Sequence, residues 1–139
     1  MRRISALLIA TMVLFSCFGI VYAADTSYRA SLTLSRYAAD AFPGDRSGEI
    51  IVSYDVKASL YANSVGVESI TFYTDDGTPV TTVTGTTSNG LIKTNSSIHG
   101  GDFVYPLPRG DYYAEVTVFA RIGSNYDSRT VTTSTVRVN

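Results

Sequence analysis

The feature of the sequence that most constrains the fold is the stretch of residues 110–121, in which two sets of side chains alternate along the chain. One set of alternate positions is apolar or aromatic: Tyr112, Ala114, Val116, Val118 and Ala120. The positions between them hold Tyr113, Glu115, Thr117, Phe119 and Arg121. A period of two is typical of a β-strand with one buried face, and small residues such as Ala114 and Ala120 indicate a central strand close to an opposing sheet. We therefore predict a core strand here.

Weaker alternation predicts further strands on both sides of this one. The expected strands cover residues 27–35, 49–58, 65–74, 79–85, 91–94, 97–105 and 127–138. Their inward positions include Ile50, Val52, Tyr54, Val56, Ala58, Ile70 and Phe72. Outside the first two dozen residues, no segment longer than a turn has a helical period. The expected fold class is all-β, an antiparallel β-sandwich of about seven short strands.

Turn residues separate the predicted strands. The segment 40–48, which reads DAFPGDRSG, is expected to break the chain after the first strand, and a loop is expected around residues 61–64. Asp75-Asp76-Gly77 predicts a hairpin, and Gly123-Ser124-Asn125 predicts a turn before the last strand. The apolar phase of that last strand shifts between Val131 and Val136, which indicates a bulge near residues 132–134 or an irregular edge strand.

Residues 1–24 are predicted to be a cleavable signal peptide rather than part of the fold. Arg2 and Arg3 are followed by an almost wholly apolar stretch, residues 4–22, and cleavage is expected after Ala23 or Ala24. A retained membrane anchor is the rival interpretation, but this stretch is short for a bilayer core of about 30 Å and no basic cluster follows it. A lipoprotein would be acylated at Cys17, where Phe15 fits the preceding motif poorly. We expect a secreted protein, extracellular or associated with the cell surface, that has no membrane span once the leader is removed.

Residues 25–139 have the commonest length of a single domain. Cys17 is the only cysteine, so the exported chain would contain no disulfide and no cysteine-bound metal. Loss of Arg2 and Arg3 changes the formal charge from −1 to −3. A mildly acidic chain without basic runs argues against nucleic acid as a partner, because phosphate binding requires clustered lysine and arginine.

Two stretches carry a resemblance to known proteins. The sequence Gly110-Asp111-Tyr112, followed by Ala114-Glu115-Val116, resembles the turn into the sixth strand of immunoglobulin-like domains. The resemblance implies that Tyr112 is a corner tyrosine bonded back to the preceding loop and that Ala114 occupies the buried cysteine position. Residues 111–120 and 128–136 make the chain similar to small secreted immunoglobulin-like β-sandwich proteins of Gram-positive bacteria that carry no assigned activity. The chain departs from antibody-type domains in having no tryptophan and no cysteine pair.

Residues that carry common chemistries are sparse in this sequence. The single histidine, His99, would form a triad with Asp102 and a serine only if the fold brought them together, and no Gly-x-Ser-x-Gly elbow is present. Most aspartates stand beside glycine or in turns, where backbone hydrogen bonds favour them, and Asp75-Asp76 lacks the spaced acidic pattern of an EF-hand loop. The sequence therefore predicts no enzyme, no metal site and no cofactor.

The outward aromatic residues are the remaining candidates for function. If the strand 65–74 neighbours the strand 110–121, Tyr73, Tyr113 and Phe119 share one solvent-facing side, and exposed aromatic clusters often mark binding surfaces. The alternative is that another strand or a loop covers them. We expect a non-enzymatic binding or surface-association module whose partner is a protein or a cell-envelope glycan. Two other classes stay open: a self-assembling envelope protein, and a small secreted effector or inhibitor acting through its loops.

Overall fold

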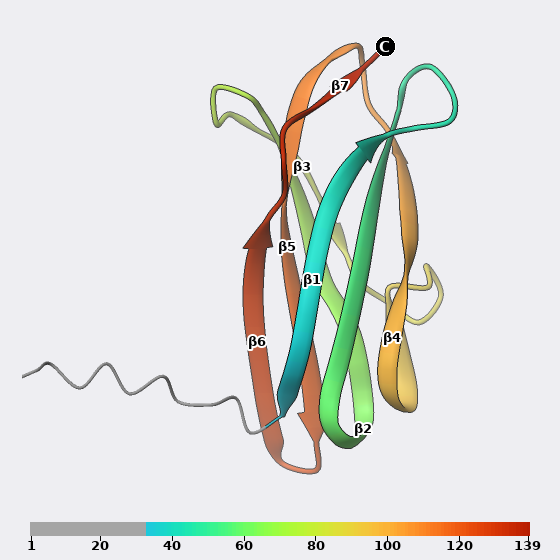
Figure 1. Ribbon diagram of the computed structural model, residues 1–139, viewed down its shortest axis with the longest axis vertical. Coiled ribbons are helices and arrows are strands. Elements are labelled where there is room, and N and C mark those ends of the chain that lie inside the picture. Colours follow the sequence, from blue (N-terminus) through green and yellow to red (C-terminus); the bar gives the residue numbers. More distant parts are fainter. Residues whose placement is uncertain (1–32) are drawn as a thin grey trace, which may run out of the picture.

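The computed structural model describes residues 33–139 of the chain, so the predicted signal peptide and most of the strand expected at residues 27–35 lie outside the described residues. The described part is all-β and contains seven antiparallel strands and no helix (Figure 1). The strands are β1 (Leu34–Pro43), β2 (Glu49–Thr74), β3 (Pro79–Thr84), β4 (Ile92–Pro106), β5 (Gly110–Ile122), β6 (Asn125–Thr132) and β7 (Val136–Val138).

The 26-residue strand β2 joins the two layers of the molecule. It bends sharply near residues 59–61, as the U-shaped green ribbon in Figure 1 shows. Its first half pairs with β1 and with the end of β4, so that Val52 lies opposite both Ala41 and Phe103. Its second half pairs with β3 and β5, so that Thr71 lies opposite both Thr82 and Glu115. One continuous strand therefore contributes to both layers.

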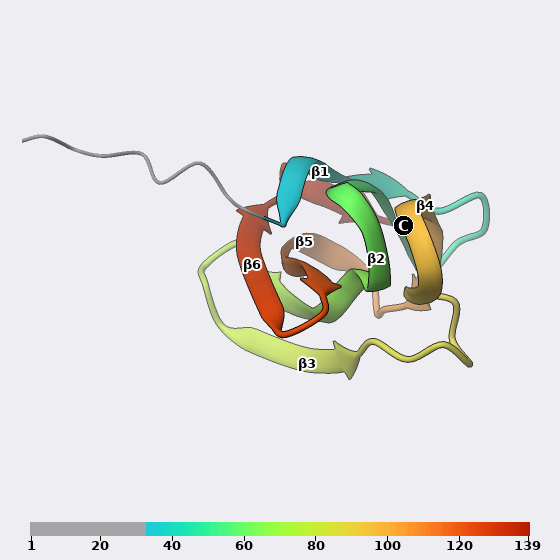
Figure 2. The ribbon, with the colours of Figure 1, turned by 90° about the horizontal axis from the view of Figure 1, so that it is seen from below.

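Strand β5 is central in the second layer, where the order of strands is β3, β2, β5, β6. It pairs with β2 on one side and with β6 and then β7 on the other. Figure 2, a view along the strands, shows the first half of β2 with β1 and β4 on one side and β3, β5 and β6 on the other. The central position predicted for residues 110–121 is confirmed.

The core lies between the layers and includes the inward residues that alternation predicts. In β5, Tyr112, Ala114, Val116, Val118 and Ala120 are all buried. The inward positions predicted in β2 are buried as well: Ile50, Val52, Tyr54, Val56, Ala58, Ile70 and Phe72. The ring of Phe72 stacks on that of Tyr105 from β4, with 5.0 Å between the ring centroids. Burial of these apolar faces supplies the main driving force for folding, because the chain described here contains no cysteine to crosslink.

Three predicted boundaries are wrong. Strand β1 continues to Pro43, which lies opposite Ile50, so the break comes after residue 43 and not at residue 40. The loop expected around residues 61–64 is strand, because Ala62 and Ser64 pair with β4. The two short strands expected at residues 91–94 and 97–105 form the single strand β4, which follows the bend of β2 and has a left-handed residue at Asn95, with φ of 52°.

The predicted turns and the irregularity near residues 132–134 are confirmed. Gly77 has φ of 87° in the hairpin between β2 and β3, and Gly123 has φ of 60° in the turn between β5 and β6. The last stretch is interrupted between β6 and β7, where Thr133 turns inward. The Thr133 hydroxyl accepts a hydrogen bond from the Ala114 N–H at 2.9 Å, and the Thr133 N–H donates to the Ala114 carbonyl, also at 2.9 Å.

Candidate functional site

Two rows of polar side chains cross the outer face of the second layer. Each of the four strands β3, β2, β5 and β6 places two outward residues in neighbouring positions. One row is Thr82, Thr71, Glu115 and Thr132, and the other is Thr84, Ser69, Thr117 and Thr130. We call these eight residues the hydroxyl face. Neighbouring strands are about 4.8 Å apart and alternate residues of one strand about 7 Å apart, so the face is a regular grid of seven hydroxyl groups and one carboxylate.

Hydrogen bonds within the rows fix the positions of several hydroxyl groups. The hydroxyl oxygens of Thr71 and Thr82 are 3.0 Å apart, and those of Thr117 and Thr130 are also 3.0 Å apart. Each hydroxyl has one donor and two acceptor positions, so these pairs keep unused hydrogen-bonding capacity. The grid is therefore ordered and still able to bind polar groups.

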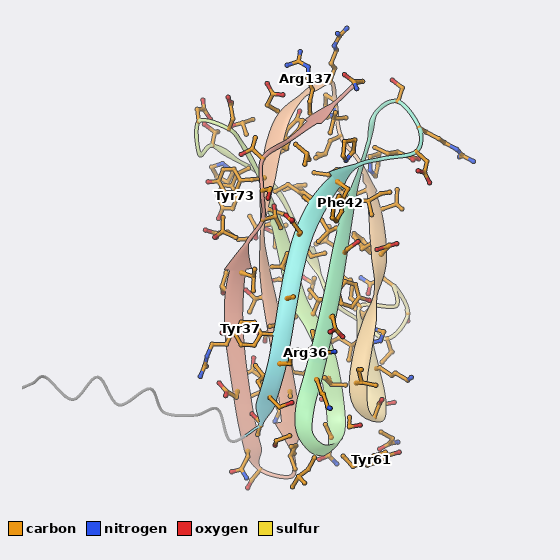
Figure 3. The ribbon with its side chains drawn as sticks, in the orientation of Figure 1. Arg36, Tyr37, Phe42, Tyr61, Tyr73 and Arg137 are labelled. Carbon is orange, nitrogen blue, oxygen red and sulfur yellow. The ribbon has the colours of Figure 1, made fainter. Side chains whose placement is uncertain are left out.

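Tyr73 and Tyr113 lie together at one end of the hydroxyl face. They are opposite one another on β2 and β5, and their rings stack with 5.1 Å between centroids and 9° between planes. The Tyr73 hydroxyl donates a hydrogen bond of 3.0 Å to the Glu115 carboxylate, and this bond raises the pKa of Tyr73. Both side chains are half-buried, and Figure 3 places Tyr73 near the upper end of the molecule. The structure thus brings together two of the three predicted aromatic residues.

Phe119 does not join this pair. It lies six residues along β5 from Tyr113, which corresponds to about 20 Å, and its side chain is only 6% exposed. Its partners on the neighbouring strands are Gly66 and Ser128, and its ring stacks on that of Tyr126 at 5.9 Å. The prediction that Phe119 is exposed together with Tyr73 and Tyr113 is wrong, because a residue from the last hairpin covers it.

Tyr126 is the aromatic residue at this end of the face that sequence reasoning missed. It is 42% exposed, lies opposite Arg121, and has the Arg121 guanidinium carbon 5.1 Å from its ring centroid. Its hydroxyl donates a hydrogen bond of 2.7 Å to Glu68, and partial burial together with this bond raises the pKa of Tyr126. The sequence did contain a signal for Tyr126: the turn predicted at residues 123–125 places Tyr126 beside Arg121 on the neighbouring strand.

Tyr112 and Ala114 are structural residues. The Tyr112 ring lies over Gly110, where a Cβ atom would be 3.1 Å from the tyrosine hydroxyl oxygen. Within residues 33–139 this hydroxyl makes no hydrogen bond to the preceding loop, so the corner bond implied by the resemblance is not present there. Ala114 is fully buried, and its backbone binds Thr133.

His99 and Asp102 lie on opposite faces of β4. His99 Nε2 is 2.6 Å from the Gly90 carbonyl oxygen, which can only accept, so Nε2 carries the proton. The Tyr54 hydroxyl also donates to this carbonyl, at 3.0 Å. Asp102 instead accepts a hydrogen bond from the Ser53 hydroxyl on the outer face. His99 and Asp102 are therefore not placed to form a catalytic triad with a serine.

Most carboxylates of the described residues bind groups of the protein itself. Asp76 accepts the Thr78 N–H at 3.0 Å within its hairpin turn. A shallow, open depression of about 500 Å³ on the outer face of the other layer is bordered by three more carboxylates. Asp55 pairs with Arg36 at 2.6 Å, Asp102 binds Ser53, and Asp40 accepts two backbone N–H groups. Among residues 33–139 no three histidine, cysteine or acidic side chains are grouped so that they could hold a metal ion.

Comparison with known proteins assigns the chain to no family. No protein-family model matches the chain, and a search of curated proteins gave no match. Between residues 33 and 139 there is no helix long and apolar enough to cross a membrane.

Proposed function

We propose that this chain is an exported, non-enzymatic binding module that holds a hydroxyl-rich polymer, such as a cell-envelope glycan, on its hydroxyl face. The observation that carries the proposal is the two-row grid of seven hydroxyl groups and one carboxylate across four adjacent strands. Such a surface donates and accepts hydrogen bonds at regular intervals, as repeated sugar hydroxyls require.

The aromatic residues support a polymer rather than a small ligand. Tyr73 and Tyr113 stand at one end of the hydroxyl face, and Tyr126 stands near the other, opposite Arg121 and therefore about 26 Å along the strand from Tyr113. Aromatic rings offer apolar contact area and, in tyrosine, a polar hydroxyl, which suits the mixed surface of a sugar ring. An extended chain of several sugar rings would span the distance between them.

We further propose an immunoglobulin-like topology for the described strands. In support, β1, the first half of β2 and the end of β4 form one layer, and β3, the second half of β2, β5 and β6 form the other. This order corresponds to the A-B-E and C′-C-F-G layers of such domains. The fold alone says nothing about the ligand, so the binding proposal depends on the hydroxyl face.

The test is retention of the chain on a cell-wall glycan array. Thr71→Val and Thr117→Val each remove one hydroxyl at nearly constant shape, and we expect the double variant to bind about thirtyfold more weakly because each lost hydrogen bond contributes about 1 kcal/mol. Tyr113→Ser should weaken binding further. The matched control is Thr135→Val, which removes an exposed hydroxyl outside the strands.

Unchanged retention of the double threonine variant, with the control also unchanged, would contradict the proposal. Circular dichroism of each variant must match that of the parent chain, so that lost retention reports the surface and not unfolding. Sedimentation of the parent chain distinguishes the self-assembling alternative, which requires a species larger than a monomer.

A further inference from the structure

The bend of β2 exposes the two most accessible large apolar side chains of the described residues. Leu60 is 67% exposed and Tyr61 is 70% exposed. Ile98 of β4, which is 46% exposed, lies opposite Lys57 just before the bend. Figure 3 shows Tyr61 at the lower end of the molecule, beyond the ribbon of β2. We call Leu60, Tyr61 and Ile98 the apolar tip.

Both lysines of the chain lie close to the apolar tip. Lys57 precedes the bend by two residues, and Lys93 lies on β4 three residues before Ser96, the partner of Ala62. Both are exposed, and neither forms an ion pair within residues 33–139. The nearest carboxylate on β2, Asp55, is bound by Arg36 at 2.6 Å. The tip is therefore an apolar projection with unpaired positive charge beside it.

The opposite end of the same layer also has exposed apolar side chains, but its charges are mixed, because the loop that follows β1 holds the exposed Arg46 beside Asp45. Phe42 is 47% exposed and Val104 is 49% exposed, and they lie on either side of Ile51. The next row of side chains there holds Asp40 and Asp102. Exposed apolar residues thus occur at both ends of the layer, but only the tip combines them with lysine.

The preceding part of the chain joins the structure beside the apolar tip. The Ser59 N–H donates a hydrogen bond of 2.8 Å to the Thr33 carbonyl, and Leu34 lies opposite Ala58. The apolar stretch 4–22 therefore connects to this end of the molecule through about ten residues, which span at most about 35 Å. A leader that enters a membrane would bring the tip to the surface of that membrane.

We propose that the apolar tip docks on the surface of an anionic lipid bilayer. Leu60, Tyr61 and Ile98 would enter the boundary between head groups and acyl chains, while the two lysines would contact lipid phosphates. Tyrosine suits this boundary because its ring is apolar and its hydroxyl is polar. On β2 the residue of the hydroxyl face nearest to the tip is Ser69, eight residues after Tyr61, so docking leaves the hydroxyl face accessible. The proposal does not depend on glycan binding.

The test measures co-sedimentation of residues 25–139, which contain all seven strands, with lipid vesicles. Vesicles of phosphatidylglycerol and phosphatidylcholine are compared with vesicles of phosphatidylcholine alone. The parent chain is expected to bind the anionic vesicles, and the double change Leu60→Ser and Tyr61→Ser should weaken this binding at least about tenfold, since it removes two large apolar side chains from the boundary. Phe42→Ser, which removes a ring that is 47% exposed at the opposite end, should leave vesicle binding unchanged.

A second pair of variants tests the charges. Lys57→Gln and Lys93→Gln together should weaken binding to anionic vesicles about tenfold or more, because each basic residue near the surface contributes roughly one factor of five. Added salt should also weaken binding of the parent chain to anionic vesicles, because it screens the lysine charges. If a tip variant alters the circular dichroism spectrum, the lysine variants decide the question.

Three results would overturn the proposal. The parent chain could fail to bind anionic vesicles, or the tip variant could bind as well as the parent. Alternatively, the tip substitutions could convert a dimer into a monomer without any vesicle binding, which would make the tip a contact between two copies of the chain. Since the vesicles contain no glycan, none of these results bears on the hydroxyl face.

Discussion

Gly66 occupies a position where the backbone of three strands leaves no room for a side chain. It lies in β2 between Ile92 of β4 and Phe119 of β5, with φ of 148°. A Cβ atom at this position would lie 2.1 Å from the Leu91 carbonyl oxygen. Leu91 is fully buried, and its carbonyl accepts the Val67 N–H at 2.8 Å, so it has little freedom to move. The close contact between the second half of β2 and the backbone at Leu91 thus requires a residue without a Cβ atom at position 66.

Gly66→Ala is expected to lower the free energy of unfolding by more than about 2 kcal/mol, because a methyl group at this position must displace the backbone around Leu91. Urea unfolding followed by circular dichroism measures the change. Gly90→Ala is the matched control: Gly90 also has positive φ, 78°, but a Cβ atom there meets nothing within 4 Å. Gly90→Ala should lower the free energy of unfolding by only about 1 kcal/mol, because only the backbone conformation disfavours alanine there. Equal losses in the two variants would show that backbone conformation, and not the contact with Leu91, makes Gly66 necessary.

Phe119 illustrates what alternation predicts at the scale of single residues and what it does not. The period of two correctly assigned Val116 and Val118 to the core and Phe119 to the other side of β5. Whether an outward ring is exposed depends on the residues that neighbouring strands place beside it. Gly66 leaves space on one side of Phe119, and Tyr126 covers it from the other. These neighbours are set by strand pairing, which local periodicity does not contain.

At the scale of elements, hairpins with glycine turns were predictable and the continuity of long strands was not. Asp75-Asp76-Gly77 identified the connection between β2 and β3 because Gly77 supplies the positive φ that the turn needs. The bend of β2 has no proline or glycine within residues 59–61, and the loop predicted around residues 61–64 did not indicate that the strand continues through the bend. Instead, β4 bends with it and keeps the strands paired on both sides.

Asp40 connects two elements that do not pair as strands, β1 and the segment between β6 and β7. Its carboxylate accepts hydrogen bonds of 2.9 Å from the backbone N–H groups of Ser134 and Ala41, and these bonds lower the pKa of Asp40. A group with a lowered pKa in the folded state stabilises the fold above its unfolded pKa, about 3.9, and loses this effect as the pH falls through its folded value.

Asp40→Asn should therefore lower the melting temperature near neutral pH, and the difference from the parent chain should disappear as the pH falls below the lowered pKa of Asp40. Melting curves between pH 7 and pH 2 measure this difference, because at low pH the parent carries an uncharged Asp40 as well. A gap between parent and variant that is constant over this range would mean that the charge of Asp40 is not involved.

At the scale of the whole molecule, the two layers are not independent because β2 runs through both. Its first half holds Ile50 and Val52 in one layer, and its second half holds Ile70 and Phe72 in the other. The number of strands and their inward faces followed from the sequence, whereas the sharing of β2 and β4 between layers did not. Two packed layers that share strands should lose their structure together.

We expect a single cooperative unfolding transition. Circular dichroism, which reports the strands, and tyrosine emission, which reports side-chain packing in a chain without tryptophan, should give the same midpoint in urea. The control is refolding from urea, which should retrace the unfolding curve. Two separate midpoints would show that one layer unfolds before the other.

The ends of the described chain have a mechanical consequence. Strand β1 begins at the end of the molecule with the apolar tip, whereas β7 ends at the other, where the C-terminus lies in Figure 1. Traction on these two ends would pull β1 along β2, and β7 along β5, parallel to the strand axes. Such shear loads whole ladders of hydrogen bonds at once instead of unzipping them one by one. The domain is thus built to resist stretching along its length.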